Sequence, residues 1–291
     1  MLCELFGNSR QAYYQRMKYT YKEAVKAEIL MQMIANERVL MPRLGGRKLL
    51  VKLKSRLPDE LQLGRDSFFD FLRNNQLLVR RRRNRIRTTF SNHWLHKYPN
   101  LVKDFIPDGP HQLWVSDITY VETREGFIYL FLITDAYSRK IVGWNVSNTM
   151  EADNAVIALQ MAISQLPAWV KRLYHHSDRG VQYCSHKYVK VLEKNNIQIS
   201  MTENGDPLEN ALAERINGLL KDEWLKDMKQ ESIDVVKSQI ADIIEIYNTQ
   251  RPHSSVDMLT PEQAHKQSGP LKRQWKNYWK VKPSCVQITT E

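Results

Sequence analysis

The sequence predicts an α/β protein with a mixed five-stranded sheet flanked by helices, preceded by an all-α N-terminal region. Apolar residues recur at helical spacing through the first third of the chain. From residue 111 onward, segments rich in β-branched and aromatic residues alternate with helical patterns. Charge divides at the same point, because residues 1–110 hold 22 Lys and Arg against 10 Asp and Glu, whereas residues 111–291 hold 21 against 22. A basic field confined to one part of a chain favours binding of a polyanion, most often nucleic acid.

The helical region is predicted to cover residues 1–79 and to consist of helices joined by short turns. In a helical projection the leucines of the third helix lie inward, while Arg47 and Lys48 lie outward with Lys52 and Lys54. This pattern is typical of a helix-turn-helix DNA-binding region, although a small bundle without a ligand looks similar. The helices are expected at 10–16 with Ser9 as its cap, at about 21–39, at 47–56 after Gly45 and Gly46, and from a cap at Asp66 or Ser67.

A basic arm and linker is expected at residues 80–108. Six arginines occupy the eight positions from 80 to 87. Such a block repels itself and is not expected to pack as a core element. It is predicted to lie along phosphates or in a minor groove, and a solvated linker is the alternative. The arginines concerned are Arg80, Arg81, Arg82, Arg83, Arg85 and Arg87.

Residues 109–267 carry the alternating strands and helices of the core, and residues 268–291 form a tail to which no structure is assigned. Tight linkers join the first three strands, which suits an antiparallel meander. An uninterrupted apolar run indicates a strand that is covered on both faces. Strands are expected at 112–121, 127–134, 140–146, 172–176 and 197–201, and helices at 152–166, 185–195, about 209–227 and 232–249.

Composition excludes several classes of protein. The chain is 42% hydrophobic, and its mean hydropathy of −0.52 is typical of soluble globular proteins. Its longest apolar run is too short to cross a bilayer, and its N-terminus lacks the pattern of a signal peptide, so no membrane partner is expected. Three distant cysteines, Cys3, Cys184 and Cys285, exclude a disulfide framework and favour a reduced, cytoplasmic setting.

Three carboxylates stand out by their positions in the predicted elements. Asp117 lies in the middle of an apolar strand, where a charge is costly unless it is paired or bound to a metal. Asp178 follows the end of a strand, where sites assemble in α/β sheets. Glu214 lies on a helix opposite the apolar side and on the same side as Lys221. Each residue alone has a structural explanation, and Asp135, Glu122, Asp206 and Glu209 are competitors for the same roles.

The spacing of these acids resembles a known family. Asp117, Asp178 and, after thirty-five intervening residues, Glu214 are similar to the D,D(35)E triad of retroviral integrases and of bacterial insertion-sequence transposases. The surrounding sequence resembles the OrfB product of insertion-sequence family three, strongly over 111–265. The motifs that carry this likeness are Trp114–Tyr120, Asp135–Trp144, His176–Tyr183, Asn210–Glu214 with Lys221, Tyr247-Asn248, Arg251-Pro252-His253 and Thr260-Pro261.

The resemblance implies a ribonuclease H-like fold and a two-metal transferase. Asp117, Asp178 and Glu214 would hold two Mg²⁺ (or Mn²⁺) ions, and Lys221 would touch the DNA backbone near the scissile phosphate. Water would cleave at the element end, and the exposed 3′-hydroxyl would then attack another phosphodiester. Oxygen ligands suit such ions, so His175 and His176 are expected to support the site rather than to bind metal. No zinc is expected, because His93 and His96 are not followed by a CxxC pair.

The resemblance also implies partners. DNA would be bound as terminal inverted repeats and as target, by a homo-multimer in the bacterial cytoplasm that is associated with the nucleoid when it binds DNA. An upstream helix-turn-helix protein, fused or separate, is a possible partner. Two rival interpretations remain: a non-catalytic DNA-binding regulator, and a ribonuclease H-like nuclease that hydrolyses DNA without strand transfer. A segment at 204–207 before the catalytic helix is expected to be either a loop that closes on DNA or a plain turn, and Arg251 is a weakly supported DNA contact.

Overall fold

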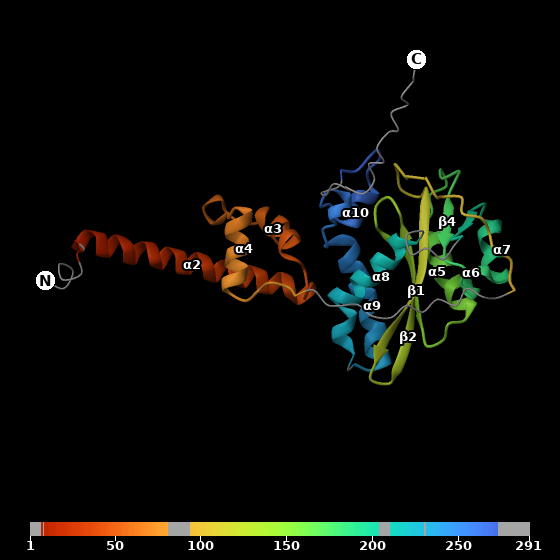
Figure 1. The fold of residues 1–291 in the computed structure, drawn as a ribbon, viewed down its shortest axis with the longest axis horizontal. Coiled ribbons are helices and arrows are strands. Elements are labelled where there is room, and N and C mark those ends of the chain that lie inside the picture. The colour runs from red at the N-terminus through yellow and green to blue at the C-terminus, as the bar shows by residue number, and fades with distance from the viewer. Residues whose placement is uncertain (1–6, 8, 81–93, 204–209, 230, 273–291) are drawn as a thin grey trace, which may run out of the picture.

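A computed structural model describes residues 7, 9–80, 94–203, 210–229 and 231–272. It contains an α/β core with a helical N-terminal region on one side, from which one long helix projects away from the core (Figure 1). The predicted fold class is confirmed, because a mixed five-stranded sheet is flanked by helices and preceded by helices alone. Within the described ranges, no helix is both long enough and apolar enough to span a bilayer.

The sheet has the strand order β3-β2-β1-β4-β5. The first three strands form the predicted antiparallel meander, and β4 and β5 pair parallel to β1 on its other side. All five predicted strands are confirmed to within two residues at their ends. Their bounds are Leu113–Thr123 for β1, Gly126–Asp135 for β2, Ile141–Ser147 for β3, Tyr174–Ser177 for β4 and Gln198–Met201 for β5.

Both faces of the sheet are covered, which explains the uninterrupted apolar run of β2. Leu130 and Leu132 belong to a cluster beneath α8 (Ala211–Glu223) and α9 (Ile233–Thr249). The alternate residues Phe131 and Ile133 pack into a second cluster with helices on the opposite face. These helices are α5 (Ala152–Ser164), α6 (Val181–Cys184) and α7 (His186–Lys194), and α10 (Pro261–His265) follows α9.

The N-terminal region differs from the prediction in its first helix. A single helix, α2, runs from Arg10 to Leu40 where two helices were expected. No glycine or proline interrupts the sequence between residues 16 and 21, so nothing there ends a helix. Ser9 is the N-cap as predicted, and its hydroxyl accepts a hydrogen bond from the backbone N–H of Ala12 at 3.1 Å.

Two shorter helices, α3 (Gly46–Lys54) and α4 (Arg65–Asn74), pack against each other after α2. A side chain at Gly46 would lie 3.0 Å from atoms of both Leu72 and Phe69, so the small residue permits the close approach. The predicted cap of α4 at Asp66 or Ser67 is wrong, because Gly64 occupies the N-cap and the helix begins earlier. Asp66 instead lies in the first turn, where a carboxylate interacts favourably with the helix dipole.

The helical region and the core share one apolar cluster. Leu49 and Phe68 belong to the same buried cluster as Leu220 and Tyr247. The indole N–H of Trp224, which follows α8, donates to the carbonyl of Leu40 at 2.8 Å. The helix that carries Glu214 is therefore held between the sheet and the N-terminal helices.

Salt bridges at this junction correct two predictions about outward basic residues. Lys48 lies 3.8 Å from Glu223, and Lys52 lies 2.7 Å from Glu37, so both lysines turn toward buried or partly buried acids. Arg251, weakly predicted as a DNA contact, is 1% exposed and donates two hydrogen bonds to Glu223, at 2.7 and 2.6 Å. Its role in this structure is to join α8 to the end of α9.

Candidate active site

Asp117 lies on β1, and Asp178 directly follows the neighbouring parallel strand β4. The register of this pair matches Val115 with His176. Each aspartate follows its matched residue by two positions, so the two lie close enough for the charge of Asp178 to act on Asp117. Two acids that are far apart along the chain are thereby brought together, as the sequence analysis required.

Partial burial and neighbouring charge act on Asp117. Burial, followed by the charge of Asp178 and to a smaller extent that of Glu214, raises the pKa of this carboxyl to about 7. Two hydrogen bonds oppose this shift: the backbone N–H of Ile118 donates to one carboxylate oxygen at 2.9 Å, and the side-chain N–H of Asn217 donates to the other at 2.8 Å. A carboxyl group whose pKa is raised by burial and by neighbouring carboxylates is a common feature of functional sites.

A tight turn holds Asp178. Its Oδ1 accepts the backbone N–H of Gly180 at 3.0 Å. A side chain at Gly180 would lie 3.0 Å from that same oxygen, so the glycine allows the backbone to approach the carboxylate. The sequence motif that follows β4 thus shapes this end of the site.

Glu214 lies in the first turn of α8, the helix that packs against β1. Its side chain is exposed, whereas Ile216 and Leu220 are buried as the helical projection predicted. Within the described part of the chain, no three acidic, histidine or cysteine side chains are grouped closely enough to hold one metal ion. The three acids therefore share one region, where the charges of Asp178 and Glu214 raise the pKa of Asp117, without forming a closed ligand cluster.

Lys221 points toward this region. Its ammonium nitrogen lies 4.0 Å from the centre of the Tyr120 ring, which is on β1. Burial lowers the pKa of Lys221, and the negative charge of Asp117 acts in the opposite direction. An ammonium group therefore lies beside the acids, two helical turns after Glu214.

Other candidates from the sequence have different positions. Asp135 is fully buried and accepts hydrogen bonds from His111 and Ser138, and Glu122 pairs with Lys229 at 2.8 Å. Asp206 and Glu209, with the expected loop at 204–207, lie outside the described residues, as do Arg81, Arg82, Arg83, Arg85, Arg87 and His93. Arg47 and Arg80 are exposed, whereas Lys48 is turned inward as described above.

A buried polar layer supports the strands below the acids. His175 on β4 contacts the hydroxyls of Ser116, at 2.7 Å, and of Tyr188, at 2.8 Å. His176 similarly contacts the hydroxyl of Ser200 on β5 at 2.9 Å. These contacts agree with the supporting role that the sequence analysis expects for both histidines.

Sequence reasoning missed Asn217 and gave Asn210, which it noted only as part of a motif, no role of its own. The Asn210 side chain donates to the carbonyl of Ser116 at 3.0 Å, and Asn217 binds Asp117 directly. Asn217 follows Glu214 by three residues, which places the two on one helix face, and that spacing is the signal that could have revealed it.

Known families and proteins are similar to this chain over most of its length. The Integrase core domain family matches residues 107–207, and a second family of the same description matches residues 195–261. The chain is 35% identical to the insertion element IS600 uncharacterized 31 kDa protein of Shigella sonnei, over 89% of this chain and 96% of that protein.

Two further relatives match over shorter lengths. The putative transposase for insertion sequence element IS986/IS6110 of Mycobacterium tuberculosis is 39% identical, over 57% of this chain and 62% of its own length. The transposase InsF for insertion sequence IS3fB of Escherichia coli is 37% identical, over 58% of each chain. Among solved structures, the HTLV-2 integrase catalytic core domain in complex with magnesium matches 55% of this chain and 99% of that chain, with a TM-score of 0.45 and 20% identity.

Proposed function

Because this chain belongs to the IS3-type transposases of bacterial insertion sequences, which contain an integrase core, we propose that it cuts its element's terminal inverted repeats and joins them to target DNA. The observation that most directly supports the reaction site is the register of β1 and β4, which brings Asp117 and Asp178 together. Glu214 is the third member of the proposed site, since its charge acts on Asp117. The activity class is that of a polynucleotidyl transferase.

An integrase core implies dependence on a divalent metal, and the donor set here fits one. Asp117, Asp178 and Glu214 offer only carboxylate oxygens, the ligands that Mg²⁺ and Mn²⁺ prefer. Their mutual repulsion, visible in the raised pKa of Asp117, is what a bound cation would relieve. We propose that these three residues hold two such ions. When bound, the ions supply activation of a water or hydroxyl nucleophile and stabilisation of the departing oxygen.

The other residues of the site position these acids and the DNA. Asn217 fixes the orientation of the Asp117 carboxylate, and the N–H of Gly180 fixes that of Asp178. Lys221, whose ammonium lies over the Tyr120 ring, would contact a backbone phosphate beside the acids. The exposed Arg47 and the arginines from Arg80 onward would carry most of the sequence-independent binding of DNA.

The assembly is also a proposal. We expect a homo-multimer on DNA, since joining two element ends to one target requires more than one site. An upstream helix-turn-helix protein, fused or separate, would add contacts to the terminal repeats.

Replacement of one acid tests the function. Full-length protein is incubated with labelled terminal-repeat DNA, unlabelled target DNA and Mg²⁺, and products are separated by size. Asp117→Asn should abolish cleavage and joining while DNA affinity stays within about twofold, because phosphate contacts come mainly from other basic residues. Asp153→Asn is the matched control, because Asp153 is exposed and pairs with Lys187 on a neighbouring helix.

The products separate the rival functions. Joined strands support transposition, cleavage alone indicates a nuclease, and binding alone indicates a regulator. Activity that persists in Asp117→Asn would overturn the proposed site.

A further inference from the structure

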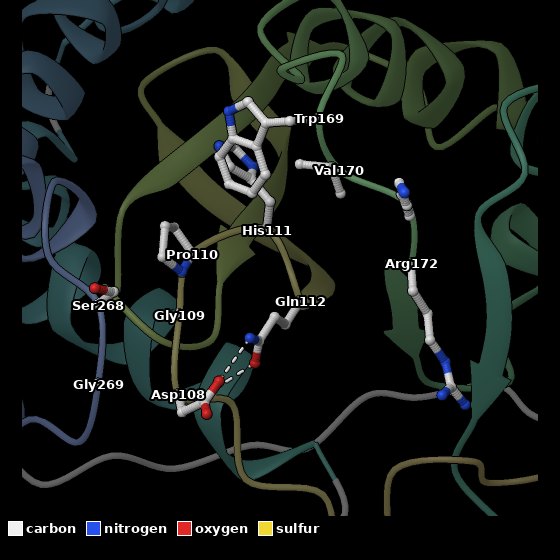
Figure 2. A pocket seen from close by; sticks show the side chains of 11 residues that line it. Asp108, Gly109, Pro110, His111, Gln112, Trp169, Val170, Arg172, Ser268 and Gly269 are labelled. Atoms are coloured by element: carbon white, nitrogen blue, oxygen red, sulfur yellow. Dashed lines mark hydrogen bonds between the residues drawn. The ribbon is translucent and has the colours of Figure 1, made fainter.

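A cavity lies at the end of the sheet where β1 and β4 begin (Figure 2). It has a volume of about 320 Å³ and is lined by residues that include His111, Gln112, Trp169, Lys171 and Arg172. His111 precedes Asp117 by six residues, which corresponds to about 20 Å along an extended strand. The cavity is therefore distinct from the proposed reaction site, and its volume is at the lower end of the range for small-ligand pockets.

One nitrogen of His111 has a buried position and no partner within the described residues. The side chain is 5% exposed and its Nδ1 receives no hydrogen bond from them, whereas its Nε2 lies 3.0 Å from Nε2 of His265. Ser138 donates its hydroxyl to Asp135, so the Ser138 oxygen must accept from Nδ1 of His265, 2.9 Å away.

Burial, followed by the charge of His265, lowers the pKa of His111 to about 4, so its ring is neutral at neutral pH. Its Nδ1 is buried without a protein partner among the described residues, which a polar atom tolerates poorly.

An exposed indole covers this imidazole. Trp169 lies with its ring centre 6.2 Å from that of His111, and Figure 2 shows the indole in front of the imidazole. Trp169 is 65% exposed, which is unusual for so large an apolar side chain. It belongs to the irregular segment between α5 and β4, so a planar ligand can pack on it without disturbing the sheet.

Positive charge borders the same cavity. Lys171 and Arg172 follow Trp169 closely in the chain, and both are exposed. The guanidinium of Arg172 also contacts the ring of Tyr174, with its central carbon 5.0 Å from the ring centre. An aromatic face and two cations are the groups that recognise a base and its phosphate.

We propose that this cavity binds one unstacked nucleotide of the DNA substrate, with its base against Trp169 and its phosphate facing Lys171 and Arg172. The inference rests on the proposed function for the identity of its ligand. It adds a DNA contact at the opposite end of the strands from the reacting phosphate. The planar ligand is a base that has been extruded from the stacked bases of the DNA. Its stacking on the Trp169 indole offsets part of the free-energy cost of that extrusion.

The test measures binding separately from catalysis. Asp117→Asn protein, which is expected not to cleave, is titrated with a single-stranded adenine pentanucleotide at raised salt, where phosphate contacts are weakened. Adding Trp169→Ala should weaken binding about fivefold or more, the effect of removing one stacked base. Trp94→Ala is the matched control and should leave affinity within about twofold, because Trp94 is 87% exposed and does not line the cavity. Lys171→Gln should reduce the salt dependence by the equivalent of about one phosphate.

Two ligand controls complete the experiment. An abasic pentanucleotide should bind to the unaltered cavity as weakly as the adenine pentanucleotide binds to Trp169→Ala. Equal binding of the adenine and abasic strands would overturn the proposal, and so would equal effects of Trp169→Ala and Trp94→Ala. If deoxyadenosine monophosphate bound as tightly as the pentanucleotide, the site would serve free nucleotides and the assignment to DNA would be wrong. Strand transfer by the wild-type protein is scored separately, so failure of the proposed function would be seen independently.

Discussion

Asn217 donates its side-chain N–H to Oδ2 of Asp117 at 2.8 Å, which links the helix that carries Glu214 to the central strand of the sheet. The amide favours the charged form of an acid that burial and two other carboxylates disfavour. Asn217 is thus placed to hold the carboxylate in the orientation that a metal ion requires.

Asn217→Ala should lower the apparent affinity of the reaction for Mg²⁺ by about 10- to 100-fold, because groups that orient metal ligands have effects of that size. The measurement is single-turnover cleavage of terminal-repeat DNA over a range of Mg²⁺ concentrations. Asn195→Ala is the control, since Asn195 caps α7 at an exposed position. An unchanged Mg²⁺ dependence in Asn217→Ala would contradict this role.

Lys48 should make folding stability rise with pH. Burial, followed by the charge of Arg251, lowers the pKa of this lysine to about 8. Between pH 8 and 10.5 the unfolded chain then binds more protons than the folded one, so the free energy of unfolding increases with pH across that window. In Lys48→Met, the increase in the free energy of unfolding across this window should be smaller than in wild type by about 2 kcal/mol.

Denaturant unfolding at about pH 8 and about pH 10.5 measures this difference. Lys54→Met is the matched control, because Lys54 is exposed on the same helix. Removal of Lys48 leaves Glu223 paired with Arg251, so the variant is expected to fold. If the free energy of unfolding rose equally with pH in wild type and Lys48→Met, the pKa of Lys48 would not be lowered by burial.

Gly143→Ala should destabilise the core by about 1–3 kcal/mol, the usual effect of overpacking. A side chain at Gly143 on β3 would lie 2.3 Å from the carbonyl oxygen of Ala158 and 2.8 Å from Ala162, both on α5. In contrast, Gly218→Ala should stabilise the protein by about 1 kcal/mol, because α8 has open space there and alanine favours a helix. Thermal unfolding of both variants is the measurement, and a Gly143→Ala midpoint at or above that of wild type would contradict the predicted close packing.

Replacement of Arg80, Arg81, Arg82 and Arg83 by alanine should weaken binding to DNA of any sequence. The slope of log affinity against log salt should fall by about 0.9 for each phosphate of duplex DNA that the variant no longer neutralises. Filter binding at several salt concentrations, with one specific and one unrelated duplex, measures both effects. A weakening confined to the specific duplex would indicate that these arginines bind bases instead of phosphates.

Local sequence patterns predicted the core well because its elements have strong and distinct periodicities. The run at 127–134 indicated a strand covered on both faces, and its alternate residues do pack into two different clusters. The first helix was divided wrongly because its exposed half lacks an apolar stripe, so the pattern there was too weak to reveal a continuous helix. One of the two predicted N-caps is confirmed. Ser9 caps α2 as predicted, whereas Gly64, the N-cap of α4, was missed because glycine has no side chain to signal a cap.

The sequence alone determined the core elements and the uneven charge and predicted the three acids proposed for the site, since these depend on residue type and spacing along the chain. Only the tertiary structure decided which of these groups meet. The register of β1 and β4 aligned Asp117 with Asp178, the packing of α8 supplied Asn217, and the junction with α3 turned Lys48 inward toward Glu223. His111 and Trp169 share a cavity for the same reason, because contacts between distant segments arise from strand order and side-chain packing, which no local pattern encodes.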